Sequence, residues 1–318
     1  MNAAAFMLEE YAPRQDYASA MLLQAHAKLN LALAVDLPVP PSGYHPLCSW
    51  FVTLDIADSI RVEPATITSL HVKWAADAPR SEPIEWPMER DLCIKALRAF
   101  EMFIGAPCPV SIQVIKRIPV GGGLGGGSSD AAATLLALRT IFAPTMTPTQ
   151  CAEIASRVGS DVSYFCDTES VIPRRAVVGG FGERVTRTFD HRESAAVLII
   201  PPFGCPTREV YERFDAVAHE CEDFGTRCTS VKRLAESRDS ISNDDLFNDL
   251  SRAAKVVQPR LTDVIDVAAR CVGKPVHVTG SGSTCFTLAS TREAPEIVRM
   301  LKMALQPLDC TVVSSNLL

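Results

Sequence analysis

The chain has 318 residues, of which 47% are hydrophobic and 21% are charged, and its net charge is −6. Such a composition is typical of a soluble globular protein, and the length favours two domains. The acidic balance argues against a nucleic-acid surface, and no apolar run approaches the roughly 18 residues that a membrane-spanning helix needs. The N-terminus lacks the basic start and apolar core of a secretory signal, so we expect a cytoplasmic protein.

The cysteines give no sign of a metal or disulfide framework. There are 11 of them, spread along the chain without any C-x-x-C pair. This pattern argues against a disulfide scaffold or a structural zinc site. We expect most of these cysteines to be reduced and buried.

The N-terminal part of the chain is predicted to combine strands with a helix. Residues 1–22 have no strong pattern and form an N-terminal extension. Residues 24–35 alternate apolar and polar positions, which predicts a half-buried strand with Lys28 and Asn30 on its polar face. Further strands are predicted at 47–56, 59–64, 69–74 and 109–119, a loop at 77–91, and a helix at 92–104 that ends at Gly105.

A second set of elements follows a glycine run at 121–127. One helix comes directly after this run, and another at 147–158 has Thr147 as its N-cap and Pro148 at its first position. The polar segment 220–245 fits a loop or a loosely packed helix. The other predicted elements are short strands around a glycine turn at 174–189, strands at 195–203 and 310–315, a strand, turn and strand at 274–290, and helices at 206–217, 246–257, 259–271 and 293–305. Adjacent groups of strands without βαβ repetition predict an α+β fold with antiparallel sheet.

The glycine run is the most informative local feature. Six of the seven residues from Gly121 to Gly127 are glycine, and a run of good helix formers follows. Glycine lets a ligand approach the backbone closely, and a helix N-terminus offers free amides with a partial positive charge. The run therefore predicts a phosphate-binding loop, with the hydroxyls of Ser128 and Ser129 as further donors. The alternative is a mobile glycine linker.

Two common phosphate-binding loops do not fit this run. No lysine follows the glycines, which excludes the G-x-x-x-x-G-K-[ST] loop. The spacing from Gly121 to Gly126 matches G-x-G-x-x-G, but the acidic residue that a dinucleotide site needs about 20 positions later is absent.

Five short stretches in order add a family resemblance. They are AKLNLAL, GYH, PVGGGLGGGSSDAA, GSDVSYF and TGSGSTCF, within residues 25–288. With them the chain resembles the GHMP kinases. The resemblance implies a two-domain α+β GHMP kinase fold, with a ribosomal protein S5 domain 2-like ATP-binding domain at 23–190 and a ferredoxin-like substrate domain at 191–318.

Three features depart from the family pattern. Ser42 stands where an aspartate usually precedes GYH, and Ser163 stands where a proline usually follows the acid of the GSD stretch. The N-terminal extension, residues 1–22, is also longer than usual. None of these departures removes a chemical group from the mechanism that the resemblance implies.

The resemblance implies ATP-dependent phosphorylation of the 2-hydroxyl of 4-diphosphocytidyl-2-C-methyl-D-erythritol (CDP-methylerythritol), in the non-mevalonate isoprenoid pathway. Mg²⁺ would be carried by ATP, with Ser128 as a candidate contact, and no other metal site is expected. Asp161 would be the general base and Lys28 would lie beside it. The expected ATP-binding residues are Pro119, Val120, Gly121, Gly122, Gly123, Leu124, Gly125, Gly126, Gly127, Ser128 and Ser129.

The same resemblance implies a set of substrate-binding residues. Tyr44 would stack on the cytosine and His45 would hydrogen-bond it, and Tyr211 would be the second aromatic of the sandwich. Asn30 shares a strand face with Lys28 and could bind the methylerythritol part. The remaining members of the set are Thr207 and, in a second tight turn that packs next to the phosphate loop, Gly280 and Ser281.

Simpler interpretations stay open for these residues. Asp161 follows a helix and could cap the next turn, and Lys28 could be a solvated strand lysine. Tyr44 and His45 could be surface residues, and a helical tyrosine such as Tyr211 is often part of a core. The turn at 280–284 could be a plain hairpin turn.

Two functional alternatives also stay open. One is another GHMP kinase, of the homoserine or mevalonate type, which cytidine dependence would distinguish. The other is a non-catalytic nucleotide sensor, which would release no ADP. We expect small-molecule partners, no nucleic acid or membrane, and a monomer or weak homodimer.

Overall fold

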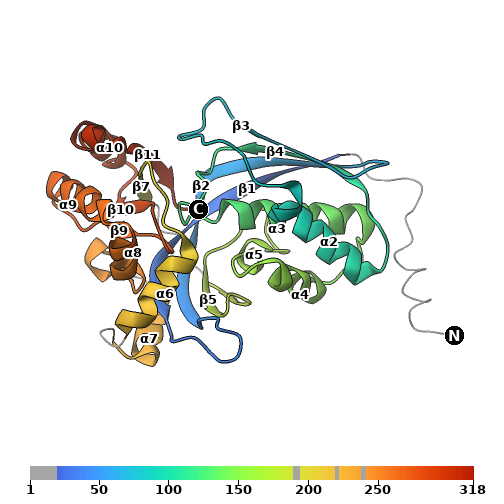
Figure 1. Ribbon diagram of the computed structural model, residues 1–318, viewed down its shortest axis with the longest axis horizontal. Coiled ribbons are helices and arrows are strands. Elements are labelled where there is room, and N and C mark those ends of the chain that lie inside the picture. Colours follow the sequence, from blue (N-terminus) through green and yellow to red (C-terminus); the bar gives the residue numbers. More distant parts are fainter. Residues whose placement is uncertain (1–19, 189–193, 219–221, 238–240) are drawn as a thin grey trace. The chain divides into compact units, whose positions relative to one another are not determined.

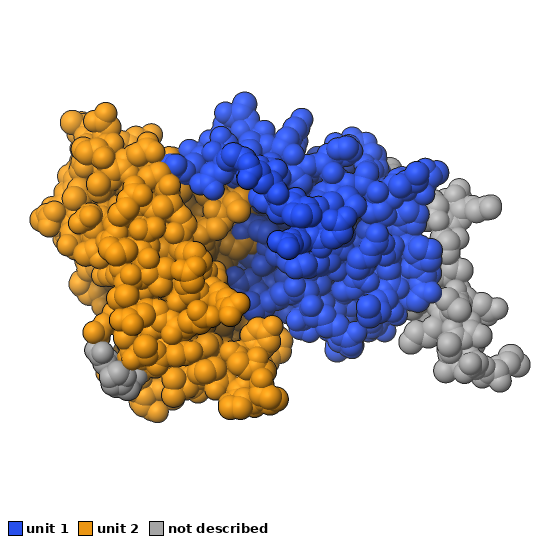
Figure 2. Space-filling view, in the orientation of Figure 1, with its two compact units in different colours: residues 1–26, 57–117, 126–173 blue, residues 27–56, 118–125, 174–318 orange. Residues whose placement is uncertain are grey.

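The computed structural model describes residues 20–188, 194–218, 222–237 and 241–318. The chain divides into two units (Figure 2). Unit 1 contains the described residues up to His26 with 57–117 and 126–173, and unit 2 contains 27–56, 118–125 and 174–318. The strands β1 (Met21–Val35) and β2 (Leu47–Pro64) therefore each contribute to both units. The predicted domain boundary after residue 190 and the extension up to residue 19 lie outside the described residues.

Unit 1 combines three paired strands with a group of helices. The second half of β2 pairs antiparallel with β4 (Val110–Lys116), and β4 pairs parallel with β3 (Ser69–Trp74). The helices that gather beside these strands in Figure 1 are α2 (Leu92–Ile104), α3 (Gly126–Phe142), α4 (Pro148–Val158) and α5 (Val162–Phe165), after a 3₁₀ turn at Met88–Arg90.

The helix ends of unit 1 follow the local sequence signals. The Asp91 side chain accepts a hydrogen bond from the amide of Cys93 at the start of α2, and Gly105 ends this helix in the left-handed conformation. Thr147 caps α4 through a capping box with Gln150. The predicted boundaries of α2 and α4 are confirmed because capping decides them locally.

Unit 2 is built on a four-stranded antiparallel sheet. Its order is β11 (Thr311–Asn316), β7 (Ala195–Ile200), β10 (Cys285–Ala289) and β9 (His277–Val278). All six residues of β7 are buried, because alternate residues face two different cores. Val197 and Ile199 pack in the core with α6 (Thr207–Val217), α8 (Ser251–Val257), α9 (Arg260–Val272) and α10 (Ala294–Ala304).

The second core of unit 2 lies on the other face of β7. Leu198 packs there with residues of β1, β2 and α7 (Phe224–Glu236). The first half of β2 pairs with β5 (Ala176–Gly180), which forms a hairpin with β6 (Arg184–Arg187). The remaining short elements of this unit are β8 (Phe247–Asn248) and the 3₁₀ turns Asn243–Asp245 and Gln306–Leu308.

Several elements differ from the prediction for tertiary reasons. The β1 strand is buried on both faces from Ala27 to Val35 and is not half-buried. The two strands expected at 47–56 and 59–64 form the single strand β2, since neither glycine nor proline separates them. The helix expected at 246–257 begins only at Ser251, because Phe247 and Asn248 pair with β1 instead.

The remaining differences are smaller. The strand expected at 109–119 ends at Lys116. Within 220–245 the described residues include a regular helix, α7, capped by Asp223, and the 3₁₀ turn Asn243–Asp245. The cysteines in the described part of the chain are free thiols. Across the described ranges, every helix is too short or too polar to span a bilayer.

Candidate active site

The first part of the glycine run forms a fixed loop in unit 2. Gly121, Gly123 and Gly125 have φ of 70°, 78° and 74°, which side chains other than glycine rarely adopt. The amide of Lys28 donates to the carbonyl of Leu124 at 2.9 Å, so that β1 holds the loop. These contacts are those of an ordered loop and not of a mobile linker.

The loop lies directly against the turn that joins β9 and β10. The amide of Thr284 donates to the carbonyl of Gly122 at 3.2 Å. A Cβ atom on Gly122 would lie closer than 3.0 Å to Thr284 Oγ1, and one on Gly123 would lie equally close to the carbonyl oxygen of Thr279. Neither glycine therefore has room for a side chain.

Asn248 fixes the same turn from the other side. Its Nδ2 donates to the carbonyls of Val278 and Gly280, both at 2.8 Å, and its Oδ1 accepts from the amide of Leu250 at 2.9 Å. Gly280 has a φ of 57°, and an ideal Cβ there would be 3.5 Å from Asn30 Oδ1. Asn248 was not predicted as a site residue, because it lies within the helix expected at 246–257.

The second part of the glycine run starts helix α3 in unit 1. The first turn, Gly126 to Ser129, has no acidic side chain. Its amides have no partner within the helix, and the helix dipole places partial positive charge there. This end of α3 is suited to an anionic group such as a phosphate.

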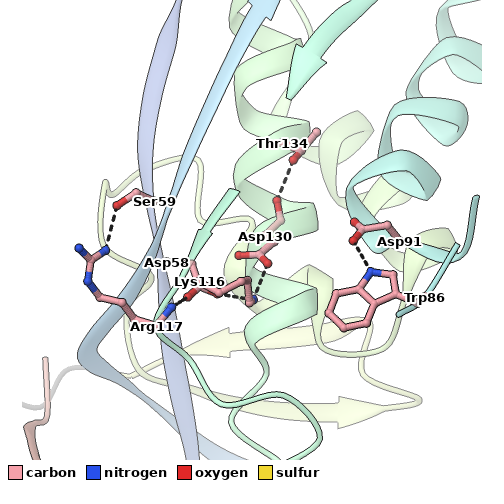
Figure 3. Close-up of polar contacts among 8 residues, drawn as sticks. All are labelled: Asp58, Ser59, Trp86, Asp91, Lys116, Arg117, Asp130 and Thr134. Atoms are coloured by element: carbon pink, nitrogen blue, oxygen red, sulfur yellow. Dashed lines mark hydrogen bonds and ion pairs between the residues drawn. The ribbon is translucent and has the colours of Figure 1, made fainter. Parts of the chain in front are cut away.

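A buried charge cluster anchors α3 to the strands of unit 1 (Figure 3). Lys116 Nζ donates to Asp130 Oδ2 at 2.7 Å and also to Asp58, whose carboxylate accepts a further bond from the amide of Arg117. The three charged residues are at most 5% exposed. Because they come from β2, β4 and α3, the cluster fixes the start of the helix relative to both strands.

The cluster holds two carboxylates for one ammonium. Burial raises the pKa of Asp130 well above its ordinary value, and the negative charge of Asp58 raises it further. Burial opposes the charge on Lys116, but the charges of Asp130 and Asp58 outweigh it and raise the pKa of the lysine. Asp130 Oδ1 is buried without a hydrogen-bond partner. Retention of a proton on Asp130 then balances the charge of the cluster.

Lys28 is part of a buried polar network in unit 2. It is 3% exposed, so the solvated alternative is wrong. Its Nζ donates to Asn30 Oδ1 at 2.7 Å and lies 4.7 Å from the centre of the Phe51 ring. The Asn30 Nδ2 group donates to Ser49 Oγ at 2.9 Å, and Thr279 Oγ1 donates to Asn30 Oδ1 at 3.2 Å. The network connects β1 with the turn that supports the glycine loop.

Helix α6 brings further predicted residues together. Thr207 Oγ1 lies 3.0 Å from Ser281 Oγ, and Tyr211 follows Thr207 by one helical turn. The Tyr211 ring centre is 4.8 Å from that of His45. His45 Nε2 lies 2.6 Å from Asp215 Oδ1, a partner that the sequence did not reveal.

The Tyr44 ring lies on the surface of unit 2. It is 70% exposed, and its centre is 6.4 Å from that of Phe181 in an edge-on arrangement. Ser42 supports this hairpin: its Oγ donates to the Val39 carbonyl at 2.8 Å and accepts from the Tyr44 amide at 3.3 Å. A serine can thus make the local turn contacts expected of an aspartate.

Asp161 lies in unit 1 at the N-cap position of α5. Its side chain makes no capping hydrogen bond to that helix. Ser163, the second departure from the family pattern, is buried with its Oγ unpartnered. Because Asp161 and Lys28 belong to different units, their expected proximity stays a prediction.

Comparisons with known proteins agree with this architecture. The family models described as "GHMP kinases N terminal domain" and "GHMP kinases C terminal" match residues 91–167 and 230–305. The 4-diphosphocytidyl-2-C-methyl-D-erythritol kinase of Caulobacter vibrioides is 32% identical over 87% of this chain and 93% of its own length. The chain belongs to the GHMP kinase family. The Deinococcus radiodurans protein of the same name is 34% identical over 83% of each chain.

Solved structures support the same conclusion for this GHMP kinase. A crystal structure of 4-(cytidine 5'-diphospho)-2C-methyl-D-erythritol kinase is 29% identical, covers 93% of this chain and 99% of its own, and has a TM-score of 0.67. The mevalonate kinase of Methanococcus jannaschii is 13% identical with a TM-score of 0.63, over 96% of this chain and 100% of its own, and shows the shared fold alone. The predicted α+β GHMP kinase fold is confirmed.

The contact between the glycine loop and its supporting turn predicts how this GHMP kinase responds to added methyl groups. Gly121→Ala and Gly123→Ala both force a side chain into positive φ, at a cost of about 1–2 kcal/mol. Only the second adds a clash, with Thr279. We expect Gly123→Ala to lose more stability in urea unfolding and to raise the KM for ATP about tenfold or more beyond Gly121→Ala. Equal effects would show that the loop does not rest on this turn.

The charge cluster predicts a pH-dependent contribution to stability. Because the pKa of Asp130 is raised in the folded state, the folded protein holds a proton that the unfolded chain releases above about pH 4. This contribution therefore falls as the pH rises, and Asp130→Asn lacks it. We expect the unfolding free energy of the wild type to exceed that of Asp130→Asn by an amount that decreases between about pH 5 and pH 8. Urea unfolding at several pH values measures this difference.

The matched control for this titration is Asp263→Asn, at an exposed position of α9. Its stability difference from the wild type should change little over the same pH range. A difference for Asp130→Asn that stays constant or grows with pH would contradict proton retention in the cluster.

Proposed function

We propose that the chain transfers the γ-phosphate of ATP to the 2-hydroxyl of 4-diphosphocytidyl-2-C-methyl-D-erythritol, a step of isoprenoid precursor synthesis. The observation that carries the proposal is the 32% and 34% identity, over more than four fifths of the chain, to proteins named as kinases of this compound. The ordered glycine loop and the buried network around Lys28 and Asn30 support it, because both belong to stretches that carry the resemblance.

The phosphate tail of ATP would be bound by main-chain amides of residues 119–129. The loop residues from Gly121 to Gly125 are held in place before any ligand arrives, which lowers the ordering cost of binding. The first turn of α3 adds unpaired amides and the hydroxyls of Ser128 and Ser129. The backbone of the glycine loop would then contact the phosphates without interference from side chains.

Mg²⁺ fits this proposal through the donor chemistry of the loop. This ion prefers oxygen ligands and takes few of them from protein when nucleotide phosphates and waters supply the rest. Ser128, partly exposed in the first turn of α3, offers such an oxygen. Mg²⁺ would offset negative charge on the phosphates.

Asp161 would accept the proton of the substrate hydroxyl as general base. Its side chain is not committed to capping α5. The ammonium of Lys28 would keep the base ionised and offset charge on the transferring group. Asn30 orients the lysine through its 2.7 Å contact and would reach the methylerythritol part.

The cytidine part of the substrate would lie against unit 2. Tyr44 is exposed enough to stack on a base, and His45 and Tyr211 are already in ring contact. Thr207 and Ser281 share a hydrogen bond within the same set of residues. These contacts favour a cytidine-bearing substrate over homoserine or mevalonate, which have no base to bind.

A turnover assay tests the proposal directly. The purified chain is mixed with MgATP and CDP-methylerythritol, homoserine or mevalonate, and both ADP release and the mass of the product are measured. We expect phosphorylation of CDP-methylerythritol alone. Turnover of one of the other alcohols would identify another GHMP kinase, and ATP binding without ADP release would favour the sensor alternative.

Asp161→Asn tests the proposed base. Because general-base catalysis typically contributes about 10²- to 10⁴-fold, we expect kcat to fall by that factor while the Kd for ATP stays within about threefold. Asp263→Asn serves as the matched control and should keep full activity. Near-normal turnover of Asp161→Asn would remove this residue from the mechanism.

A further inference from the structure

Helix α6 holds the ring of His45 in one orientation. The His45 Nε2 atom lies 2.6 Å from Asp215 Oδ1. The ring centre is 4.8 Å from that of Tyr211 and 6.2 Å from that of Phe214, so two aromatic rings flank the imidazole. Its side chain is 8% exposed. An imidazole that is packed and tied in this way cannot rotate freely.

The contact with Asp215 also determines where the ring proton lies. An ionised carboxylate only accepts hydrogen bonds, so Nε2 must carry the hydrogen that points at Asp215. In the neutral imidazole, Nδ1 is then an acceptor. Among the described residues, no group forms a hydrogen bond with His45 Nδ1. This atom is also not one of the fully buried, unpartnered polar atoms, so it is accessible from the surface.

The open acceptor lies one residue from an exposed aromatic ring. Tyr44 is 70% exposed, and Phe181 supports its edge. The hairpin that carries Tyr44 and His45 is pinned by the hydrogen bonds of Ser42. A flat base that stacks on Tyr44 would therefore meet a hydrogen-bond acceptor of fixed position.

We propose that Asp215 is a specificity-determining residue, which fixes the Nε2–H tautomer of His45 so that Nδ1 accepts a hydrogen bond from the amino group of cytosine and rejects uracil. This inference rests on the proposed cytidine-bearing substrate. Asp215 itself acts through His45 and is a positioning residue.

The selectivity follows from the edges of the two bases. Cytosine carries an amino donor at the position where uracil carries a carbonyl acceptor. An acceptor on the protein can pair with the amino group of cytosine. It cannot pair with the carbonyl of uracil, because a lone pair of the acceptor would face a lone pair of that oxygen. Sites that bind through a defined hydrogen bond reject ligands that lack the partner group. We expect the wild type to bind CDP roughly tenfold or more tighter than UDP.

Calorimetric titration with CDP and UDP tests the proposal. In Asp215→Ala the imidazole is free to place its hydrogen on Nδ1 and donate to uracil, so the affinity ratio should fall to within about threefold. A cooperative urea unfolding transition and a wild-type circular dichroism spectrum verify that Asp215→Ala folds. Glu209→Ala, an exposed acid on the same helix, is the matched control and should keep the wild-type ratio.

A spectroscopic measurement separates tautomer control from a purely structural role. In ¹⁵N-histidine-labelled protein, the His45 signals can be assigned by their loss in His45→Asn. We expect the wild type to show a protonated Nε2 and an unprotonated Nδ1, and Asp215→Ala to show a tautomer mixture. Asp215→Glu, which keeps a carboxylate, should restore part of the CDP preference.

The outcomes distinguish this inference from the proposed function. Equal loss of CDP and UDP binding in Asp215→Ala, with an unchanged ratio, would overturn the inference and leave Asp215 as a structural contact. A wild type that phosphorylates CDP-methylerythritol but does not discriminate CDP from UDP would overturn it as well. A wild type that binds neither nucleotide and phosphorylates no CDP-methylerythritol would reject the proposed function itself.

Discussion

The contact between the backbone of Gly122 and Gly123 and the turn at 279–284 is the constraint on which the candidate site depends. The side chain of Thr284 and the carbonyl of Thr279 approach the loop so closely that they leave no room for a Cβ atom on Gly122 or Gly123. The hydrogen bonds from Thr284 to Gly122 and from Lys28 to Leu124 then fix the loop. The glycines therefore provide space as much as flexibility, and the result is an ordered loop whose amides are positioned in advance. Preorganised amides of this kind stabilise negative charge at little reorganisation cost.

Local signals were sufficient for much of the fold. Helical spacing and the stop at Gly105 predicted α2, and the Thr147 cap with Pro148 predicted α4, because a helix end is decided by a few adjacent residues. The apolar run of β7 predicted a buried strand, because a continuous apolar run is itself a local signal. The glycine run and the order of the motifs identified the family, since each motif is a short contiguous stretch of sequence.

Long-range partners could not be predicted in the same way. Lys116 and Asp58 are 58 residues apart, and Asn30 and Thr279 are 249 residues apart. A charged residue in a strand looks the same in the sequence whether it faces water or a buried counter-ion. Lys28 and Asn30 were therefore predicted on a polar face, and no role was predicted for Asp58, Lys116 or Asp215.

The two buried lysines, Lys28 and Lys116, differ in the kind of group that they contact. Lys116 donates to the carboxyl groups of Asp58 and Asp130, so its ammonium is already paired within the buried cluster. Lys28 contacts an amide oxygen and the face of Phe51, which stabilise a cation without neutralising it. The partners of Lys116 thus assign it to anchoring α3, whereas the action of Lys28 on the transferring group stays a proposal.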